Sequence, residues 1–225
     1  LFLGGEEVIS TMQIANGFKV NLFASEQQFP DLVNPVQMAF DTKGRLWVST
    51  WPTYPHWTPR VNQRNDKLLI LVDGDGDGKA ETQKVFADGL HNPTGFEFWG
   101  GGVIVANCPN LLFLKDTDGD DVADQRIRIL GGISSGDTHH SANSFVLDPA
   151  GWIYFQEGVF HRTQIETPYG PVRNRDGAVW RFNPRTYQVE RYAAYGFANP
   201  HGHVVDRWGQ HFVHDGTGAV PFHGT

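Results

Sequence analysis

The sequence predicts an all-β fold, a β-propeller built of four-stranded blades. The main observation is a pattern that recurs at intervals of 58, 51 and 56 residues, in which an Asn precedes a short apolar run, a turn and a second apolar run. A repeat of this length with strand–turn–strand content is typical of propeller blades. The short apolar runs have strand character, and long helical windows are missing. The blades are predicted to start near Asn34, Asn92, Asn143 and Asn199.

Each repeat predicts its strands in the same order. The Asn opens the innermost strand, a turn that contains Gly leads into the second strand, and in the first three repeats an outer hairpin follows. The predicted second strands begin after these turn residues: Gly44, Gly102, Gly151 and Gly209. Residues 161–177 interrupt the third repeat with polar residues and Pro, and we expect them to form a loop over one face. The best helical stretch, residues 5–13, is short.

The 225 residues hold about four blades, so we interpret residues 1–225 as a single, incomplete propeller domain. Propellers close with four to eight blades. A six-bladed ring needs roughly 330 residues at this period, and the fourth repeat lacks an outer hairpin. We therefore expect either the N-terminal part of a larger, six-bladed parent or a propeller that a partner segment completes. An open ring exposes one face and the edges of its blades.

Composition and charge exclude several classes of function. The chain carries 25 acidic and 18 basic residues, a formal charge of -7, and nine of the acids lie in two short loops. No basic patch remains that would bind nucleic acid. No run of about 18 apolar residues marks a transmembrane segment. Cys108 is the single cysteine, so this chain has neither an internal disulfide nor a Cys-x-x-Cys-His haem attachment site.

The two acidic loops, residues 73–81 and 116–124, place carboxylates at positions 1, 3, 5 and 9. Like charges this close repel one another unless a cation lies among them, and oxygen ligands at this density suit calcium. The spacing is that of the first part of an EF-hand loop, but Lys84 and Ile127 stand where an EF-hand needs its last Glu. Strand-like runs flank both loops. We therefore expect calcium loops that join two strands; the alternative is a pair of solvated acidic turns.

The predicted calcium ligands come from alternate positions of each loop. They are the side chains of Asp73, Asp75, Asp77 and Glu81 with the carbonyl of Lys79, and the side chains of Asp116, Asp118, Asp120 and Asp124 with the carbonyl of Val122. In the second loop Asp121 replaces the turn glycine. Loops this open suit the millimolar calcium outside the cytoplasm, so we expect a periplasmic or otherwise exported protein, although no signal peptide is visible.

Four histidines fall at the predicted start of an innermost strand: His91, His139, His140 and His201. Those strand starts surround one mouth of the central channel, where propeller sites are usually built. A histidine there can take the proton of a sugar hydroxyl because its pKa lies near the working pH, and Asp137 can orient the imidazole. The alternative is that these side chains only hydrogen-bond neighbouring strands.

The same histidines support two other functions. Neutral imidazoles are common ligands of transition metals. A lyase or hydrolase acting on sugars or lactones could hold such a metal with His139, His140, His201 and His203. The other function is that of a non-catalytic propeller that binds a partner or a glycan. An aromatic loop at residues 51–57 either lines the channel mouth or packs between blades.

Two segments resemble a known family. Residues 136–143 read Gly-Asp-Thr-His-His-Ser-Ala-Asn and lead into Asp-Pro-Ala-Gly-Trp-Ile-Tyr at 148–154. This resembles the catalytic-histidine blade of the soluble quinoprotein glucose and aldose-sugar dehydrogenases, and residues 195–202, Tyr-Gly-Phe-Ala-Asn-Pro-His-Gly, resemble the next stretch of that family. The similarity spans residues 13–218 and is closest to the planctomycete-type "membrane-bound dehydrogenase" or sorbosone dehydrogenase-like propellers, which also carry Asp-rich loops.

The resemblance implies a quinoprotein-like oxidoreductase that acts on a sugar or polyol. It implies a general base at His140 and a cofactor contact at Asn199. From their positions in the sequence we add Asp137 and His139 as further catalytic candidates and His201 as a further cofactor contact. The cofactors that it implies are calcium and pyrroloquinoline quinone, and the redox partner is a cytochrome c domain or subunit. The sugar dehydrogenases carry Arg where this chain has Ala198, and their other cofactor-binding cations come from later blades. We therefore expect the 225 residues alone to be inactive.

Overall fold

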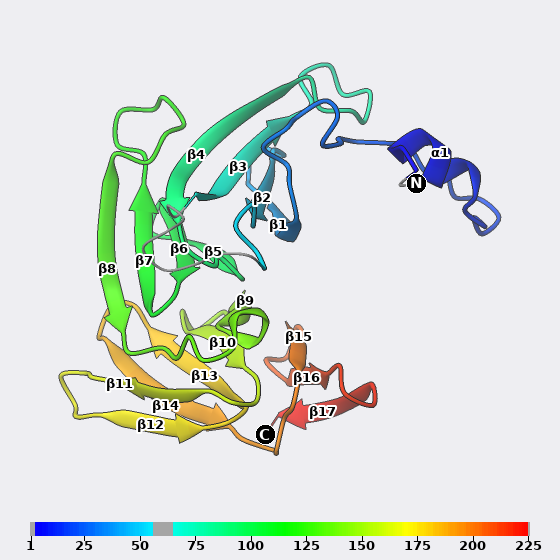
Figure 1. Cartoon of the computed structure of the whole chain (residues 1–225). Helices are drawn as coiled ribbons and strands as arrows, with labels where there is room; N and C mark the ends of the chain where they lie inside the picture. The colour runs from blue at the N-terminus through cyan, green and yellow to red at the C-terminus, as the bar shows by residue number, and fades with distance from the viewer. Residues whose placement is uncertain (1–2, 56–64, 225) are drawn as a thin grey trace.

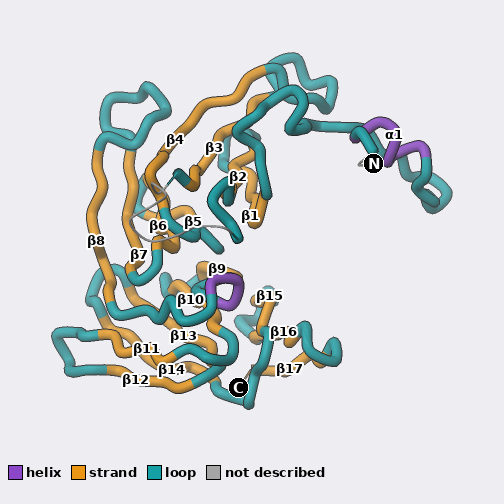
Figure 2. Tube along the Cα trace, in the orientation of Figure 1, coloured by secondary structure: helices purple, strands orange, loops and turns teal. Residues whose placement is uncertain are grey.

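The computed structural model describes residues 3–55 and 65–224, which form four larger antiparallel sheets arranged in an open arc, together with a separate two-stranded sheet (Figure 1). The predicted all-β, propeller-like arrangement of four blades is confirmed. Strands make up most of the regular structure (Figure 2), and the helical parts of the described chain are α1 (Gly5–Ser10) and a single 3-10 turn, Thr138–His140. No described helix is long and apolar enough to cross a membrane.

Each sheet is a blade whose strands follow one another along the chain. Blade 1 consists of β1 (Pro35–Phe40), β2 (Leu46–Thr50), β3 (Asp66–Val72) and β4 (Thr82–Leu90), and blade 2 of β5 (Phe96–Trp99), β6 (Gly102–Asn107), β7 (Asn110–Lys115) and β8 (Gln125–Gly131). Blade 3 consists of β9 (Asn143–Leu147), β10 (Ile153–Glu157), β13 (Ala178–Asn183) and β14 (Gln188–Ala193), and blade 4 of β15 (Pro200–Val205), β16 (His211–Asp215) and β17 (Val220–Gly224).

An asparagine turns the chain into the innermost strand of the first two blades. Asn34 and Asn92 have φ of 47° and 58°, in the left-handed region that Asn tolerates better than most residues. The Asn34 side-chain amide donates to the Trp51 carbonyl at 3.1 Å, and the Asn92 amide donates to the Ser141 hydroxyl at 2.7 Å. Asn therefore recurs at these corners because it both permits the backbone turn and ties it to a neighbouring segment.

Apolar side chains fill the space between neighbouring blades. Between blades 1 and 2, the Trp47 ring lies 4.5 Å from Phe86 of its own blade and 5.3 Å from Phe98 of the next, measured between centroids. Phe155 and Trp180 of blade 3 are fully buried in the cluster shared with blade 2. The apolar core of the protein therefore lies between neighbouring blades, where the faces of two sheets pack together.

Residues 161–177 form a β-hairpin, not the predicted loop. β11 (Arg162–Ile165) and β12 (Val172–Arg175) pair antiparallel. The fully buried Ile165 reaches the core between blades 2 and 3, and the Gln164 N–H donates to the Gly132 carbonyl at 3.0 Å. Position 132 requires glycine, because a Cβ there would lie 1.9 Å from the Gln164 carbonyl oxygen. The strands are too short, and too rich in charged residues, for their alternation to be recognised from the sequence alone.

Two buried histidines lie inside blade 4. His203 Nε2 is 2.9 Å from His211 Nδ1, and both rings pack against the Tyr154 ring of blade 3. Burial, with a smaller contribution from the neighbouring His211, lowers the pKa of His203 to about 4. Burial also lowers the pKa of His211. Both imidazoles are therefore neutral near pH 7, and one of them can donate its proton to the other in a hydrogen bond.

We predict that acid destabilises blade 4 through His203. Its folded pKa, about 4, lies below the ordinary value of 6.5, so its stabilising contribution is complete above pH 6.5 and is lost as the pH falls toward 4. This difference corresponds to on the order of 3 kcal/mol. His203→Phe should flatten the pH dependence of the free energy of unfolding, measured by urea denaturation, whereas His223→Phe at an exposed position should not. An equally steep decline in both variants would contradict the assignment.

Candidate functional site

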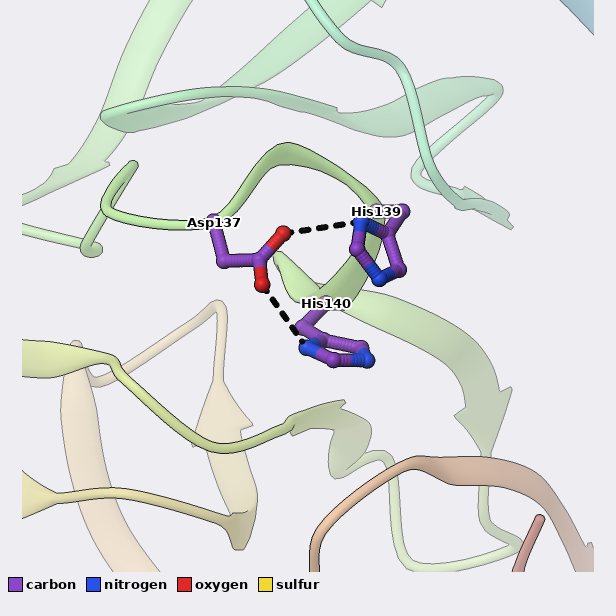
Figure 3. Close-up of side chains that lie close together, drawn as sticks. All are labelled: Asp137, His139 and His140. Atoms are coloured by element: carbon purple, nitrogen blue, oxygen red, sulfur yellow. Dashed lines mark ion pairs between the residues drawn. The ribbon is translucent and has the colours of Figure 1, made fainter. Parts of the chain in front are cut away.

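The segment that joins blade 2 to blade 3 brings three predicted site residues together (Figure 3). His139 Nδ1 lies 2.8 Å from one carboxylate oxygen of Asp137, and His140 Nδ1 lies 3.2 Å from the other. The centroids of the two imidazole rings are 4.0 Å apart. One carboxylate therefore contacts two imidazoles, which restricts the orientation of both rings.

The two imidazoles differ in exposure. The His139 side chain is 52% exposed, whereas that of His140 is 6% exposed. Gly158 packs against His140, and a Cβ at position 158 would lie 2.9 Å from the His140 Cβ and 2.6 Å from the Ala198 carbonyl oxygen. His140 is therefore enclosed by blade 3 and the following corner, while His139 faces solvent.

Hydrogen bonds from blade 2 hold the 3-10 turn in place. The Thr138 carbonyl accepts from the Asn92 side-chain amide at 2.9 Å and from the Ser141 hydroxyl at 2.8 Å. The Thr94 hydroxyl donates to the Ala142 carbonyl at 2.6 Å. The corner that opens blade 2 thus also positions the histidine-bearing segment.

A buried carboxylate and a buried histidine support the same segment from blade 3. Glu157 accepts hydrogen bonds from the Trp180 indole at 2.8 Å and the Thr163 hydroxyl at 2.7 Å. His161 Nδ1 lies 3.5 Å from Glu157, and its Nε2 lies 2.9 Å from the Asp137 carbonyl oxygen. Burial by itself would lower the pKa of His161, but the hydrogen bond and charge of Glu157 outweigh it and raise the pKa. A protonated His161 donates to the Asp137 backbone and so fixes the segment.

A pocket of about 450 Å³ lies beside His139. Its lining comes from all four blades and includes Trp51, Thr94, His139, Asn143 and His201. The pocket therefore lies where the innermost strands converge, at the mouth predicted for the histidines. Trp51 of the predicted aromatic loop reaches it, whereas residues 56 and 57 of that loop lie outside the described residues.

Three of the predicted site residues do not line this pocket. His139 and His201 do, but Asp137, His140 and Asn199 are not among its lining residues. The Asn199 side-chain amide instead donates to the Thr217 hydroxyl. The base role of His140 and the cofactor role of Asn199 stay predictions.

The charge of the pocket wall is low. Among the described residues that line it there is no lysine or arginine. Partial burial by neighbouring atoms lowers the pKa of His201, and the nearby His140 and His139 add a smaller lowering. Part of the His201 residue nevertheless remains exposed to solvent. His201 is therefore neutral at pH 7. The described pocket wall thus offers hydrogen-bonding groups but no lysine or arginine to pair with a multiply charged anion.

The first acidic loop gathers all four predicted carboxylates. Ligand oxygens of Asp73, Asp75, Asp77 and Glu81 lie within 4.8 Å of one another. Backbone N–H groups of the loop donate to the three Asp side chains at 2.7 to 3.1 Å. These bonds wrap the backbone around the carboxylates, which a calcium loop requires. The carbonyl ligands predicted at Lys79 and Val122 remain predictions.

The second acidic loop gathers three carboxylates, those of Asp116, Asp118 and Asp120, within 4.8 Å of one another. Asp124 does not belong to this group, and its carboxylate accepts hydrogen bonds from the Thr117 N–H at 3.0 Å and from the Thr117 hydroxyl. Backbone hydrogen bonds, foremost that of Gly119, lower the pKa of Asp116. The loop therefore keeps its first carboxylate ionised.

Asp121 occupies the glycine position of the second loop and connects that loop to blade 1. Its φ is 66°, in the same left-handed region as the 87° of Gly78 at the matching position of the first loop. Its carboxylate lies 2.7 Å from Arg45 Nη1 and 3.2 Å from Lys84 Nζ. Arg45 and, to a lesser degree, Lys84 lower the pKa of Asp121. The residue that departs from the EF-hand pattern thus links two blades.

Comparisons with known proteins identify a family and related folds. A family described as Domain of unknown function (DUF7133) matches residues 5–223. The chain is similar to the holo form of the pyranose dehydrogenase PQQ domain from Coprinopsis cinerea, with a TM-score of 0.55 and 14% identity over 81% of this chain and 44% of that one. It is also similar to XC5397 from Xanthomonas campestris, a gluconolactonase, with a TM-score of 0.54 and 16% identity over 82% of this chain and 55% of that one.

These structural similarities concern the fold alone, because both identities are low. No curated protein matches the chain significantly. The chain spans about half the length of the two solved structures, 44% and 55%.

We predict that His161 stabilises the site segment most at acidic pH. Its folded pKa is raised above the ordinary value of 6.5, so its contribution is complete below pH 6.5 and is lost as the pH rises through the folded pKa. His161→Leu leaves Glu157 buried without its histidine and should lower the free energy of unfolding by about 1–3 kcal/mol in urea denaturation. His161→Gln can still donate to the Asp137 carbonyl and should recover part of the loss. If His161→Leu has the same free energy of unfolding as the parent at acidic pH, the His161–Glu157 pair makes no net contribution to stability.

Proposed function

The chain belongs to the family described as Domain of unknown function (DUF7133), and we propose that it is part of an oxidoreductase acting on a sugar or polyol at the pocket beside His139. The observation that carries the proposal is an imidazole held by the Asp137 carboxylate at the mouth of a pocket to which four blades contribute. The likeness to a pyranose dehydrogenase and a gluconolactonase supports a sugar-derived substrate. On the segment 136–143 we also propose the narrower relationship to the planctomycete-type "membrane-bound dehydrogenase" propellers.

Proton removal is the step that these residues can perform. A sugar hydroxyl in the pocket would donate its proton to the imidazole of His139, and Asp137 would stabilise the imidazolium that forms. Oxidation of the hydroxyl to a carbonyl would also require a two-electron acceptor, such as a quinone, to take the hydride from the carbon that bears this oxygen, and the described blades do not supply that acceptor. His140 contacts the same carboxylate from the buried side. The resemblance names His140 as the base, while the geometry favours His139, so both must be tested.

Pyrroloquinoline quinone, the acceptor that the resemblance implies, does not fit the described residues by themselves. It carries three carboxylates, and the described pocket lining contains no lysine or arginine to neutralise them. Ala198 stands where the sugar dehydrogenases have Arg, and His201 is neutral at pH 7 because its pKa is lowered. We therefore assign no step to the quinone. The described blades supply a base, the carboxylate that orients it and part of the pocket wall.

A transition-metal-dependent lyase or hydrolase is the second candidate function. Asp137, His139 and His140 offer ligand atoms within 4.8 Å of one another. The Nδ1 of the buried His140 contacts the Asp137 carboxylate, but its Nε2 has no hydrogen-bond partner among the described residues, and a metal ion would satisfy it. Such an ion could activate water against a lactone. His201, which was expected among the ligands, does not belong to this cluster.

We predict that single substitutions separate the two functions. In the full-length natural protein, replacing the general base should lower turnover by roughly 100-fold or more. The measurement is dye reduction with a panel of aldoses and polyols for His139→Ala, His140→Ala and Asp137→Asn. His214→Ala, a partly exposed histidine outside the pocket lining, is the matched control and should keep full activity.

Other outcomes of the same experiment favour other functions. Activity that is lost to a transition-metal chelator, with loss of bound metal in all three variants, would replace the oxidoreductase by the metal-dependent enzyme. Saturable binding of a glycan without turnover would indicate a binding propeller. Undiminished dye reduction in both histidine variants would remove both imidazoles from the mechanism.

We also propose that both acidic loops bind calcium. The cluster at residues 73–81 would hold one ion through four carboxylates, and the cluster at 116–120 would hold another, with Asp124 joining after its side chain turns away from Thr117. Hydrogen bonds from the loop backbone already place the oxygens on one side of each loop. Bound calcium would remove the repulsion among the carboxylates and so stabilise the outer hairpins.

We predict that chelation lowers the melting temperature and that calcium restores it. A ligand present at 100 times its Kd contributes about 2.7 kcal/mol to stability. Asp75→Asn should abolish binding of one ion and Asp118→Asn that of the other in titration calorimetry, because an amide keeps the hydrogen bond of the turn but loses the charge. Asp206→Asn is the matched control, since its carboxylate accepts similar bonds in the β15–β16 turn. An unchanged melting temperature in excess chelator would count against structural ions at both loops.

Export and a redox partner complete the proposal. Calcium loops of this openness suit the millimolar calcium outside the cytoplasm, so we propose a periplasmic or otherwise exported protein. From the resemblance alone we add a cytochrome c domain or subunit as the electron acceptor. Fractionation of producing cells, followed by mixing with candidate cytochromes, tests both, and recovery from the cytoplasm would count against export.

A further inference from the structure

The outermost strand of blade 1 contacts the acidic loop of blade 2 through a bulge. Phe86 in β4 has no partner in the register with β3, because the pairing shifts there. Its free carbonyl accepts a hydrogen bond from the Ala123 N–H of the loop at 2.7 Å. Two residues earlier, the Lys84 ammonium donates to the Asp120 carbonyl at 3.0 Å. These contacts define how an outer strand meets the loop of the next blade.

The N-terminal segment makes matching contacts with the loop of blade 1. The Phe23 carbonyl accepts from the N–H of Ala80, which is the residue of the first loop that matches Ala123, at 2.8 Å. Two residues earlier, the Asn21 side-chain amide donates at 2.5 Å to the carbonyl of Gly78, which lies one loop position after the residue that matches Asp120. The sequence repeats as well, with Asn-Leu-Phe-Ala at 21–24 and Lys-Val-Phe-Ala at 84–87. The segment therefore lies against blade 1 as β4 lies against blade 2.

The inner part of the same face of blade 1 lacks a cover in the described structure. Phe96, four residues after the corner asparagine of blade 2, is 1% exposed, whereas the matching residue of blade 1, Met38, is 70% exposed. Two residues further on, Phe40 is 64% exposed. A groove of about 520 Å³ runs between β1 and the N-terminal segment. The side chains that cover Phe96 come from the strands of blade 1, so a comparable sheet is what the groove lacks.

We propose that residues 19–24 are the outermost strand of the blade that precedes blade 1 in the ring, and that the groove receives the three inner strands of that blade from another part of the same propeller. The interface between blades 1 and 2 shows the arrangement that we expect, since Trp47, Leu68 and Ile70 of blade 1 share an apolar cluster with Phe96 of blade 2. None of the described strands pairs with residues 19–24, so one edge of this segment is free. Figure 1 shows the segment (blue) on the side of blade 1 that faces the opening of the arc toward blade 4.

This arrangement specifies the chemistry of the occupant. It must present an antiparallel strand edge to the backbone of residues 19–24, and large apolar side chains to Met38 and Phe40. A sheet of the same propeller meets both conditions in the geometry already seen between blades 1 and 2. Pairing there would join the first strand of the ring to its last blade and so remove the exposed sheet edge.

Hydrogen–deuterium exchange of the full-length natural protein tests the proposal. The amides of residues 19–24 should exchange about 100-fold more slowly than in the isolated 225-residue chain. The β4 peptide, residues 82–90, should be protected in both and serves as the internal reference. Met38→Lys places a charge in the groove and should remove the protection at 19–24. Ile127→Lys, at an apolar residue that is 42% exposed on β8, is the matched control and should keep it.

Two outcomes would overturn the proposal. Fast exchange at residues 19–24 in the full-length protein, with β4 protected, would show that no strand pairs there. Protection that disappears on dilution would assign the groove to a second copy of the chain rather than to the same propeller. Should Met38→Lys fail to fold, as judged by loss of protection in β4, the milder Met38→Ser provides the same comparison.

Discussion

Apolar packing between neighbouring blades is the interaction on which the rest of this structure depends. A twisted four-stranded sheet has two apolar faces and cannot bury either of them alone. Trp47 and Phe86 therefore pack with Phe96 of the next blade, and Trp180 fills the following interface. Burial of one such side chain contributes roughly 1.5–3 kcal/mol, whereas an exposed ion pair contributes about 0.2–1 kcal/mol. The apolar layers hold the blades together, and the polar contacts determine how they align.

The contacts between blades 1 and 2 show this division. Asp121 meets Arg45 and Lys84 at the outer rim, where each ion pair is partly solvated and individually weak. Their geometry is specific, because the left-handed backbone of Asp121 directs its carboxylate toward blade 1 while the rest of the loop folds around its own acids. A residue that weakens the resemblance to an EF-hand loop thus links the outer parts of two sheets.

The sequence predicted those features that local chemistry determines. The blade starts were recognisable because Asn34 and Asn92 occupy corners with positive φ, and the acidic loops because their spacing follows from wrapping a backbone around oxygens. The roles of His161 and Glu157 could not be predicted, since they depend on a contact between His161 and the backbone of Asp137, 24 residues earlier. The sequence contains one sign that residues 19–24 pack against blade 1, the Phe-Ala pair repeated at 23–24 and 86–87. That repeat could be interpreted only after the structure showed the matching hydrogen bonds to Phe23 and Phe86.

The Asp137, His139 and His140 cluster lies outside the sheets, so contacts from the neighbouring blades must hold it in place. Asp137 and its two histidines lie on a connection, so they have no strand ladder to hold them in place. Blade 2 reaches the connection through Asn92, and blade 3 reaches it through His161. A change in the packing of either blade would therefore move the carboxylate relative to the pocket without touching a site residue. A base that must meet a substrate within hydrogen-bond distance can tolerate little of that movement. It follows that the blade interfaces, as much as the histidines, determine whether the proton transfer that we propose can occur in this pocket.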